Sequence, residues 1–229
     1  MFPLLNPIFL LGILIALSVH EWAHAFTAYK LGDSTAKDHG RMTLNPLAHL
    51  DLLGSILFLF AAFGWGKPVP VNPRNFRHPK RDSAITALAG PVSNLVLAAV
   101  SFGGLFLLFP HTSSPSSSSL LDLLLTQPGG SPFTAFAHQF LSACLFLNLG
   151  LMAFNLLPIA PLDGSKVLQA FIPVSLEDAY DTFMQWGPYV LLSLLIGERL
   201  LNLSLLSGWI SWWIDAVLHL FQVLVGGKF

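Results

Sequence analysis

Six long apolar stretches follow one another along this chain, and most are long enough to cross a lipid bilayer as a helix. The first runs from Pro7 to Tyr29, and its 23 residues would form a helix about 34 Å long, which matches a hydrocarbon core of roughly 30 Å. The others span about 52–66, 84–109, 133–157, 183–206 and 208–226. A chain with this pattern is expected to fold as a polytopic membrane protein.

The charge content agrees with this expectation. Only 10% of the 229 residues are charged and 54% are hydrophobic, whereas an ordinary soluble domain has roughly 25% charged residues. The formal net charge of -1 indicates no nucleic-acid partner. The length predicts one integral membrane domain over 1–229, with a core at about 7–175 and a C-terminal helical pair at about 183–226.

The second apolar stretch, 52–66, is the short one. It has 15 residues and contains Gly54, Gly64 and Gly66, which favours a re-entrant or interfacial segment over a full crossing. Eight of the eleven Lys and Arg residues lie between positions 30 and 81, and the positive-inside rule places all of them on the cytoplasmic side only if 52–66 turns back. The loop 110–132 has no Lys or Arg and is expected outside. We therefore predict an all-α transmembrane bundle of about five full spans plus one short re-entrant or interfacial segment.

A candidate metal site lies near the end of the first stretch. The segment His20-Glu21-Trp22-Ala23-His24 has the H-E-x-x-H pattern, and two helical residues four apart are separated by about 40° and 6 Å, so both imidazoles can reach one ion. Glu21 lies on the same side and can take a proton from water without being a ligand. The alternative is a helix end whose His and Glu side chains meet lipid headgroups, but burying three ionisable groups in an apolar span is costly.

A catalytic zinc ion needs a third protein ligand and an open position for water. Cys144 is the one cysteine of the chain, so we expect histidine and carboxylate ligands. The best candidate is Asp163, which follows the stretch 133–157 where Pro158, Pro161 and Gly164 interrupt the helix. The alternative for Asp163 is an aspartate in an interfacial turn.

Membrane depth supports the same ligand set. If 52–66 is re-entrant, His24 and Asp163 both lie near the cytoplasmic face, whereas a full crossing would put them on opposite faces. The remaining histidines are expected to be surface or packing residues; they are His39, His49, His78, His111, His138 and His219.

Four segments carry a resemblance to a known family. They are 20–24, the segment 41–46 followed by His49 and Asp51, the segment 90–94 with the sequence Gly-Pro-Val-Ser-Asn, and the segment 161–164 with the sequence Pro-Leu-Asp-Gly. In order and spacing they resemble the site-2 protease family of intramembrane zinc metalloproteases, in its compact subgroup without PDZ or CBS domains. The resemblance covers about residues 10–175. It implies an integral protein of a bacterial or archaeal cell membrane with its active site near the cytoplasmic side.

The resemblance also implies a function, which is hydrolysis of peptide bonds in or next to transmembrane segments of membrane protein substrates. By this resemblance one zinc ion per chain is bound by His20, His24 and Asp163, and Glu21 is the catalytic base. Asn94 is placed beside the active site. Its amide is expected either to assist catalysis, by donating to the oxyanion or holding the scissile carbonyl, or to form a hydrogen bond between helices.

Other functions and roles stay open from the sequence. A membrane metal-binding or metal-transport protein without peptidase activity would also carry His and Asp in its spans, but on several helices along a path. A catalytically silent scaffold is disfavoured because a base and all candidate ligands are present. The segment Lys67–Pro73 is either an edge strand that pairs with unwound substrate or a cytoplasmic loop. Trp209, Trp212 and Trp213 either pack against the core or gate lateral entry.

Overall fold

The computed structural model describes residues 6–61, 64–109, 130–201 and 203–225. Every regular element in these ranges is a helix, and the one extended pairing found there is an isolated antiparallel bridge between Leu50 and Gly66. The predicted all-α class is therefore confirmed for the described residues. The predicted outer loop falls mostly at 110–129, which lies outside them.

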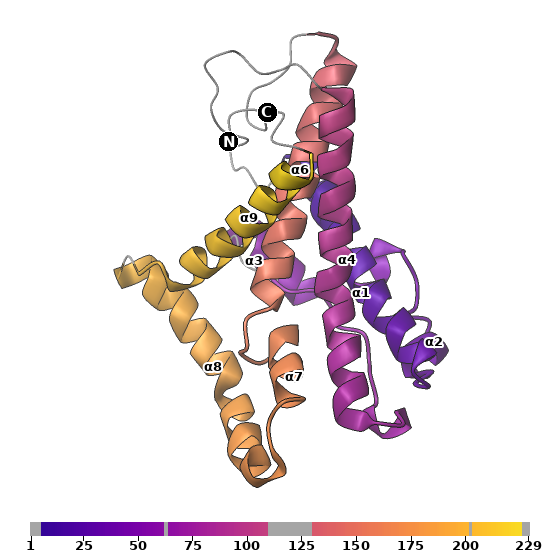
Figure 1. Cartoon of the computed structure of the whole chain (residues 1–229), viewed down its shortest axis with the longest axis vertical. Coiled ribbons are helices and arrows are strands. Elements are labelled where there is room, and N and C mark those ends of the chain that lie inside the picture. The colour runs from indigo at the N-terminus through magenta and orange to yellow at the C-terminus, as the bar shows by residue number, and fades with distance from the viewer. Residues whose placement is uncertain (1–5, 62–63, 110–129, 202, 226–229) are drawn as a thin grey trace.

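Three long helices form the centre of the fold: α1 (Pro7–Lys30), α4 (Pro79–Leu108) and α6 (Pro132–Asn155). Each begins with a proline, whose missing N–H is not needed in the first turn of a helix. Asn6 and Ser131 cap α1 and α6 by accepting hydrogen bonds from first-turn N–H groups. Figure 1 shows α4 and α6 running side by side, and α1 contacts both of them.

These three helices are the ones in the described part of the chain that are individually long and apolar enough to cross a membrane. The helices α8 (Glu177–Leu201) and α9 (Leu205–Leu224) meet this criterion only as a pair and are bent by 97° relative to each other. The predicted five full spans are therefore not confirmed, because the structure has three candidate spans, or four if the bent pair is one span. Figure 1 shows α8 and α9 meeting at this corner.

A polar contact joins α8 and α9 near this corner. Glu198 lies near the end of α8, and its Oε1 accepts hydrogen bonds from the backbone N–H and the hydroxyl of Ser207 in α9, at 2.9 and 2.5 Å. A charged residue thus caps the next helix. The apolar stretch 183–206 is thus divided between two helices and does not form one straight span.

The short stretch 52–66 turns back on itself. Its helix, α3 (Leu52–Ala61), has only 10 residues, and Gly66 pairs with Leu50 on the far side of the excursion. A side chain at Gly54 would collide with the backbone of Trp65, so the glycine allows the two arms to approach. The two ends of this excursion therefore lie next to each other, which fits both a re-entrant and an interfacial segment.

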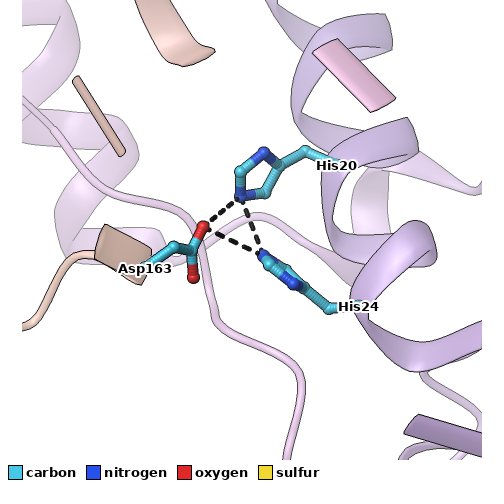
Figure 2. A group of neighbouring side chains, drawn as sticks. All are labelled: His20, His24 and Asp163. Carbon is cyan, nitrogen blue, oxygen red and sulfur yellow. Dashed lines mark hydrogen bonds and ion pairs between the residues drawn. The ribbon is translucent and has the colours of Figure 1, made fainter. Parts of the chain in front are cut away.

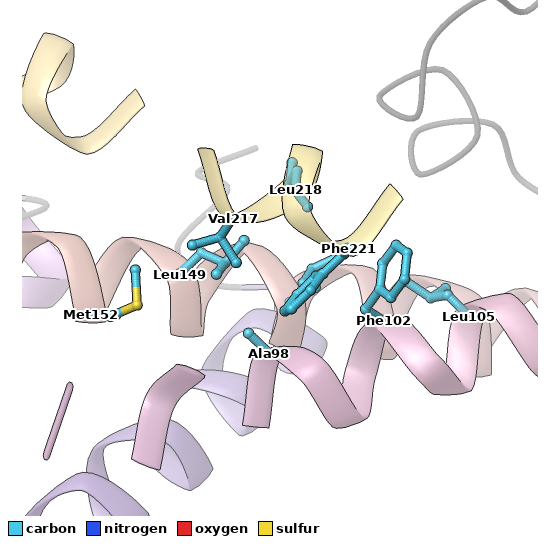
Figure 3. Close-up of a cluster of buried hydrophobic side chains, with 9 residues drawn as sticks. Ala98, Phe102, Leu105, Leu149, Met152, Val217, Leu218 and Phe221 are labelled. Carbon is cyan, nitrogen blue, oxygen red and sulfur yellow. The ribbon is translucent and has the colours of Figure 1, made fainter. Parts of the chain in front are cut away.

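A hydrophobic core holds α9 against α4 and α6, as Figure 3 shows. The rings of Phe102 and Phe221 lie 5.0 Å apart at its centre. Trp209 donates a hydrogen bond from its indole N–H to the carbonyl of Ala153 in α6, at 2.8 Å. The C-terminal helix thus packs against the core. The cluster consists of Ala98, Phe102, Leu105, Leu145, Leu149, Met152, Val217, Leu218 and Phe221.

Short helices complete the fold. The helix α7 (Asp163–Gln169) follows α6 and lies against α4, and Tyr180 of α8 donates a hydrogen bond to the carbonyl of Ser165 in α7 at 2.5 Å. The other short elements are α2 (Thr35–Asp38), η2 (Pro46–Ala48), η3 (Pro73–Asn75) and η4 (Val174–Leu176). The position of α7 matters for function because this helix carries Asp163 to the centre of the bundle.

Candidate active site

Three side chains from two distant parts of the chain converge at the centre of the bundle (Figure 2). His20 and His24 lie one turn apart on α1, and their Nε2 atoms are 3.0 Å from each other. Asp163 begins α7, and its Oδ2 lies 3.2 Å from the Nε2 of each histidine. Among the described residues this is the group that could hold a metal ion.

Both imidazoles are oriented by contacts to α4. The Nδ1 of His20 lies 2.6 Å from the Oδ1 of Asn94, and the Nδ1 of His24 lies 2.7 Å from the carbonyl oxygen of Thr86. Because oxygen atoms of this kind only accept hydrogen bonds, each Nδ1 carries the proton and donates it. Each Nε2 then presents a lone pair toward Asp163, which is the tautomer that a metal ligand requires.

The group fits a zinc ion. Ligand atoms about 2.0–2.1 Å from a tetrahedral zinc ion are separated from one another by about 3.3 Å, close to the 3.0–3.2 Å found here. The Oδ2 of Asp163 is buried and has no hydrogen-bond donor. A cation at this point would contact this oxygen and both Nε2 lone pairs at once. The Oδ2 of Asp163 is therefore placed to act as the third ligand.

Gly90 of α4 makes room for this group. A Cβ atom at this position would lie 2.5 Å from the Nε2 of His24 and 2.6 Å from the Nε2 of His20. Only a glycine therefore allows α4 to pass so close to both rings. The Gly-Pro pair singled out in the sequence analysis thus has a steric role beside the candidate metal ligands.

Glu21 faces a cavity together with the three candidate ligands. Its Oε2 accepts a hydrogen bond of 2.9 Å from the backbone N–H of Val69, and the side chain is 8% exposed. The cavity has a volume of about 300 Å³. Its other lining residues come from the extended segment after α3, from α4 and from the region of α7; they are Pro68, Val69, Val71, Pro73, Ser83, Thr86, Ala87, Asn155, Pro161, Lys166 and Gln169.

A second polar cluster fixes the segment that contacts Glu21. Asp33, just after α1, is fully buried and accepts hydrogen bonds from the N–H of Thr35, the N–H of Asn72 and the side-chain amide of Asn75, at 3.1, 2.7 and 2.7 Å. Burial alone would raise the pKa of Asp33, but these hydrogen bonds hold it below the ordinary value, so Asp33 is charged. It ties the segment that contains Val69 to the end of the helix that carries Glu21.

Comparison with known proteins identifies the family. The family model described as Peptidase family M50 matches residues 8–196, which is most of the chain. The chain belongs to peptidase family M50. This family comprises the site-2 proteases, so the expected membership is confirmed.

The M50 relatives agree in their names. The chain is 38% identical over 192 residues to a Bacillus subtilis (strain 168) protein named "Putative zinc metalloprotease YwhC", and the alignment covers 84% of this chain and 81% of the relative. It is 31% identical over 193 residues to "Putative zinc metalloprotease Rip2" of Mycolicibacterium smegmatis, covering 82% of this chain and 66% of the relative. No solved structure matches the chain. As an M50 member the chain is a zinc-dependent metalloprotease, and its apolar helices are those of an integral membrane protein.

The structure of this M50 protein brings together four of the five residues expected at the site, because His20, Glu21, His24 and Asp163 share one cavity. Asn94 is fully buried behind His20 and is absent from the cavity lining. The described histidines outside the H-E-x-x-H segment take no part in the metal-binding group.

The sequence analysis did not predict three groups that surround the candidate site. They are the carbonyl of Thr86, the buried carboxylate of Asp33, and Asn148 of α6, which hydrogen-bonds to Asn94. A backbone carbonyl leaves no trace in a sequence. Asp33 and Asn148 could have been found from the sequence. Asp33 follows an apolar stretch and Asn148 lies within one, and an unpaired polar group is costly there.

Proposed function

We propose that this M50 member is an intramembrane zinc metalloendopeptidase, which hydrolyses peptide bonds in or next to transmembrane segments of membrane protein substrates. In this proposal His20, His24 and Asp163 hold one zinc ion, and Glu21 is the catalytic base. The observation that carries the proposal is that three candidate ligand atoms lie 3.0–3.2 Å apart. Two of them belong to α1, a helix that is long and apolar enough to cross a bilayer.

The chemistry follows from the positions of the side chains. Zinc, when bound, supplies Lewis acidity that polarises the scissile carbonyl and lowers the pKa of water toward about 7. Glu21 is adjacent to His20 on α1 and faces the same cavity, so it can accept the proton of the attacking water and return it to the leaving amine. The N–H of Val69 holds one carboxylate oxygen of Glu21, and the other oxygen is the proton acceptor.

The substrate class follows from the location of the cavity. Peptide bonds of a transmembrane helix are protected by internal hydrogen bonds, so the substrate must unwind before cleavage. The segment Lys67–Pro73 is extended up to η3 and borders the cavity, so it can offer backbone groups to an unwound substrate. The basic region 30–81 adjoins the end of α1 that carries the site, and we therefore place the site near the cytoplasmic face of a bacterial or archaeal cell membrane.

The competing function is metal binding or transport without peptidase activity. A transport path needs metal-binding residues at successive depths. In the described part of the chain the candidate ligands form one group at one depth, beside a carboxylate that can serve as a base. This arrangement favours hydrolysis.

The proposal is tested by reconstituting the purified chain in lipid vesicles with a single-span substrate labelled at both ends. We expect two fragments whose new termini, located by mass spectrometry, fall in or within a few residues of the span. A zinc chelator should stop this cleavage and added zinc should restore it. Cleavage of soluble peptides alone would contradict the intramembrane part of the proposal. Zinc flux into the vesicles without any cleavage would favour transport.

Gly90→Ala tests the crowding around the candidate ligands. Because the new Cβ would lie within 2.6 Å of both imidazoles, at least one ring has to move away from Asp163. We expect zinc affinity, measured by competition with a chromophoric chelator, to fall by about tenfold or more, which is the usual scale for disturbing the surroundings of a metal ligand.

Gly103 provides the matched control for this substitution. It lies on the same helix, and a Cβ at that position would have no neighbour within 4 Å. Gly103→Ala is therefore expected to keep the zinc affinity of the wild type. If Gly90→Ala also kept it, the histidines would not bind the ion in the orientation seen here.

A further inference from the structure

A chain of three buried hydrogen bonds links His20 to α6. The Nδ1 of His20 lies 2.6 Å from the Oδ1 of Asn94, and the Nδ2 of Asn94 donates to the Oδ1 of Asn148 at 2.8 Å. The Nδ2 of Asn148 donates in turn to the carbonyl of Cys144, one turn earlier on α6, at 2.7 Å. Asn94 and Asn148 are 0% and 1% exposed, so water cannot replace these partners.

The carbonyl of Cys144, at the end of this series of hydrogen bonds, determines which group donates in each of them. A backbone carbonyl only accepts hydrogen bonds, so the amide nitrogen of Asn148 must face Cys144 and its oxygen must face Asn94. The oxygen of Asn148 accepts a hydrogen bond from the amide nitrogen of Asn94. With its nitrogen facing Asn148, Asn94 must direct its oxygen toward His20. His20 must then carry its proton on Nδ1, which leaves its Nε2 lone pair directed at Asp163.

We propose that Asn148 is a positioning residue that fixes the tautomer and ring orientation of His20 through Asn94. Asn148 does not line the cavity, so it acts on the metal site without touching substrate. The inference rests on the proposed function, because it assumes that His20 is a zinc ligand. The inference also assigns Asn94 to the support of His20, although a catalytic role was one of the two expectations for Asn94. The Nδ2 of Asn94 donates to Asn148 and, at 3.4 Å, to the carbonyl of Ala16.

The two histidines differ in how much support they need. His24 donates to the backbone carbonyl of Thr86, which cannot present a donor in place of its oxygen. His20 donates to a carboxamide, whose rotation by 180° would put an NH₂ group against Nδ1. A third group that prevents this rotation is therefore needed only for His20. Asn148 is the nearer acceptor in that place, at 2.8 Å, and the carbonyl of Ala16 is the more distant one, at 3.4 Å.

The test compares zinc loss from purified, zinc-loaded variants in detergent, followed with an excess of chromophoric chelator. Asn148→Leu removes both polar atoms at similar volume, and we expect zinc to leave about tenfold faster or more, as for other groups that support metal ligands. Asn148→Ala is the second variant in case leucine prevents folding. Ser101→Ala is the matched control, because Ser101 is a buried polar residue of α4 that bonds only to the carbonyl of Leu97.

A double-mutant comparison separates positioning from general loosening of the bundle. If Asn148 acts through Asn94, the Asn148 substitution should add no further acceleration in an Asn94→Ala background. Multiplicative effects of the two substitutions would overturn the inference. Zinc loss from both Asn148 variants at the wild-type rate would overturn it as well.

The wild type and His20→Ala, measured in parallel, distinguish this inference from the proposed function. If His20→Ala loses zinc rapidly and the Asn148 variants do not, only the role of Asn148 is wrong. If His20→Ala holds zinc as tightly as the wild type, His20 is not a ligand, and the proposed ligand set and the inference both fail.

Discussion

Glu21→Gln is expected to stop proteolysis while the zinc ion stays bound. Glutamine has the size of glutamate and keeps an oxygen that can accept the N–H of Val69, which now bonds to Oε2 at 2.9 Å. It cannot take up a proton from the attacking water, and loss of a general base typically slows a reaction about 10²–10⁴-fold. The measurement is the initial cleavage rate in vesicles, with the zinc content of the same preparation determined by elemental analysis.

Glu177→Gln is the matched control for the charge change. Glu177 begins α8, forms an ion pair with Lys80 and does not line the cavity, so the cleavage rate should equal that of the wild type. A wild-type rate for Glu21→Gln would mean that another group is the base. Loss of zinc from that variant would mean that Glu21 helps to hold the ion.

The parts of the site that depend on local geometry could be predicted from the sequence. The spacing of His20 and His24 places both rings on one side of any helix, and the proximity of Asp163 followed from the requirement that ligands of one ion share a depth. The distribution of Lys and Arg and the short length of 52–66 predicted a re-entrant or interfacial segment, and the pairing of Leu50 with Gly66 agrees with a chain that turns back. These arguments succeed because the bilayer restricts the chain to a few depths.

The number of spans could not be predicted in the same way. The stretches 183–206 and 208–226 are long and apolar by composition, but Glu198 caps the start of α9 and the two helices meet at a sharp angle. A count of apolar residues gives the length of a stretch, but it does not show where a polar side chain contacts the next helix. The contact that joins the two helices is between residues nine positions apart in the sequence.

The surroundings of the candidate ligands depend on tertiary structure throughout. The carbonyl of Thr86 and the amide of Asn94 reach α1, and the amide of Asn148 reaches Asn94, only because α1, α4 and α6 pack as they do. Gly90 illustrates this limit, because the sequence marks it only as part of the segment 90–94 and does not show that both imidazoles pack against it.

Removing the carboxylate of Asp163 is expected to weaken zinc binding itself. Structural zinc sites with four ligands bind with about 10–16 kcal/mol, or roughly 2.5–4 kcal/mol per ligand, which corresponds to about 10²–10³-fold in affinity. Asp163→Asn keeps the volume of the side chain and removes the anionic oxygen that lies 3.2 Å from each histidine. We expect both Asp163→Asn and Asp163→Ala to show this loss in a chelator competition, and the exposed Asp178, replaced by Asn, to show none.

The response to added zinc should separate the Asp163 variants from Glu21→Gln. Asp163→Asn loses affinity and retains the base, so raising the free zinc concentration should refill the site and restore part of the cleavage. Glu21→Gln already holds its zinc, so the same addition should leave it inactive. If Asp163→Asn and Asp163→Ala bound zinc as tightly as the wild type, Asp163 would be excluded as the third ligand, because a carboxylate that shares the ion with two imidazoles cannot be removed without cost.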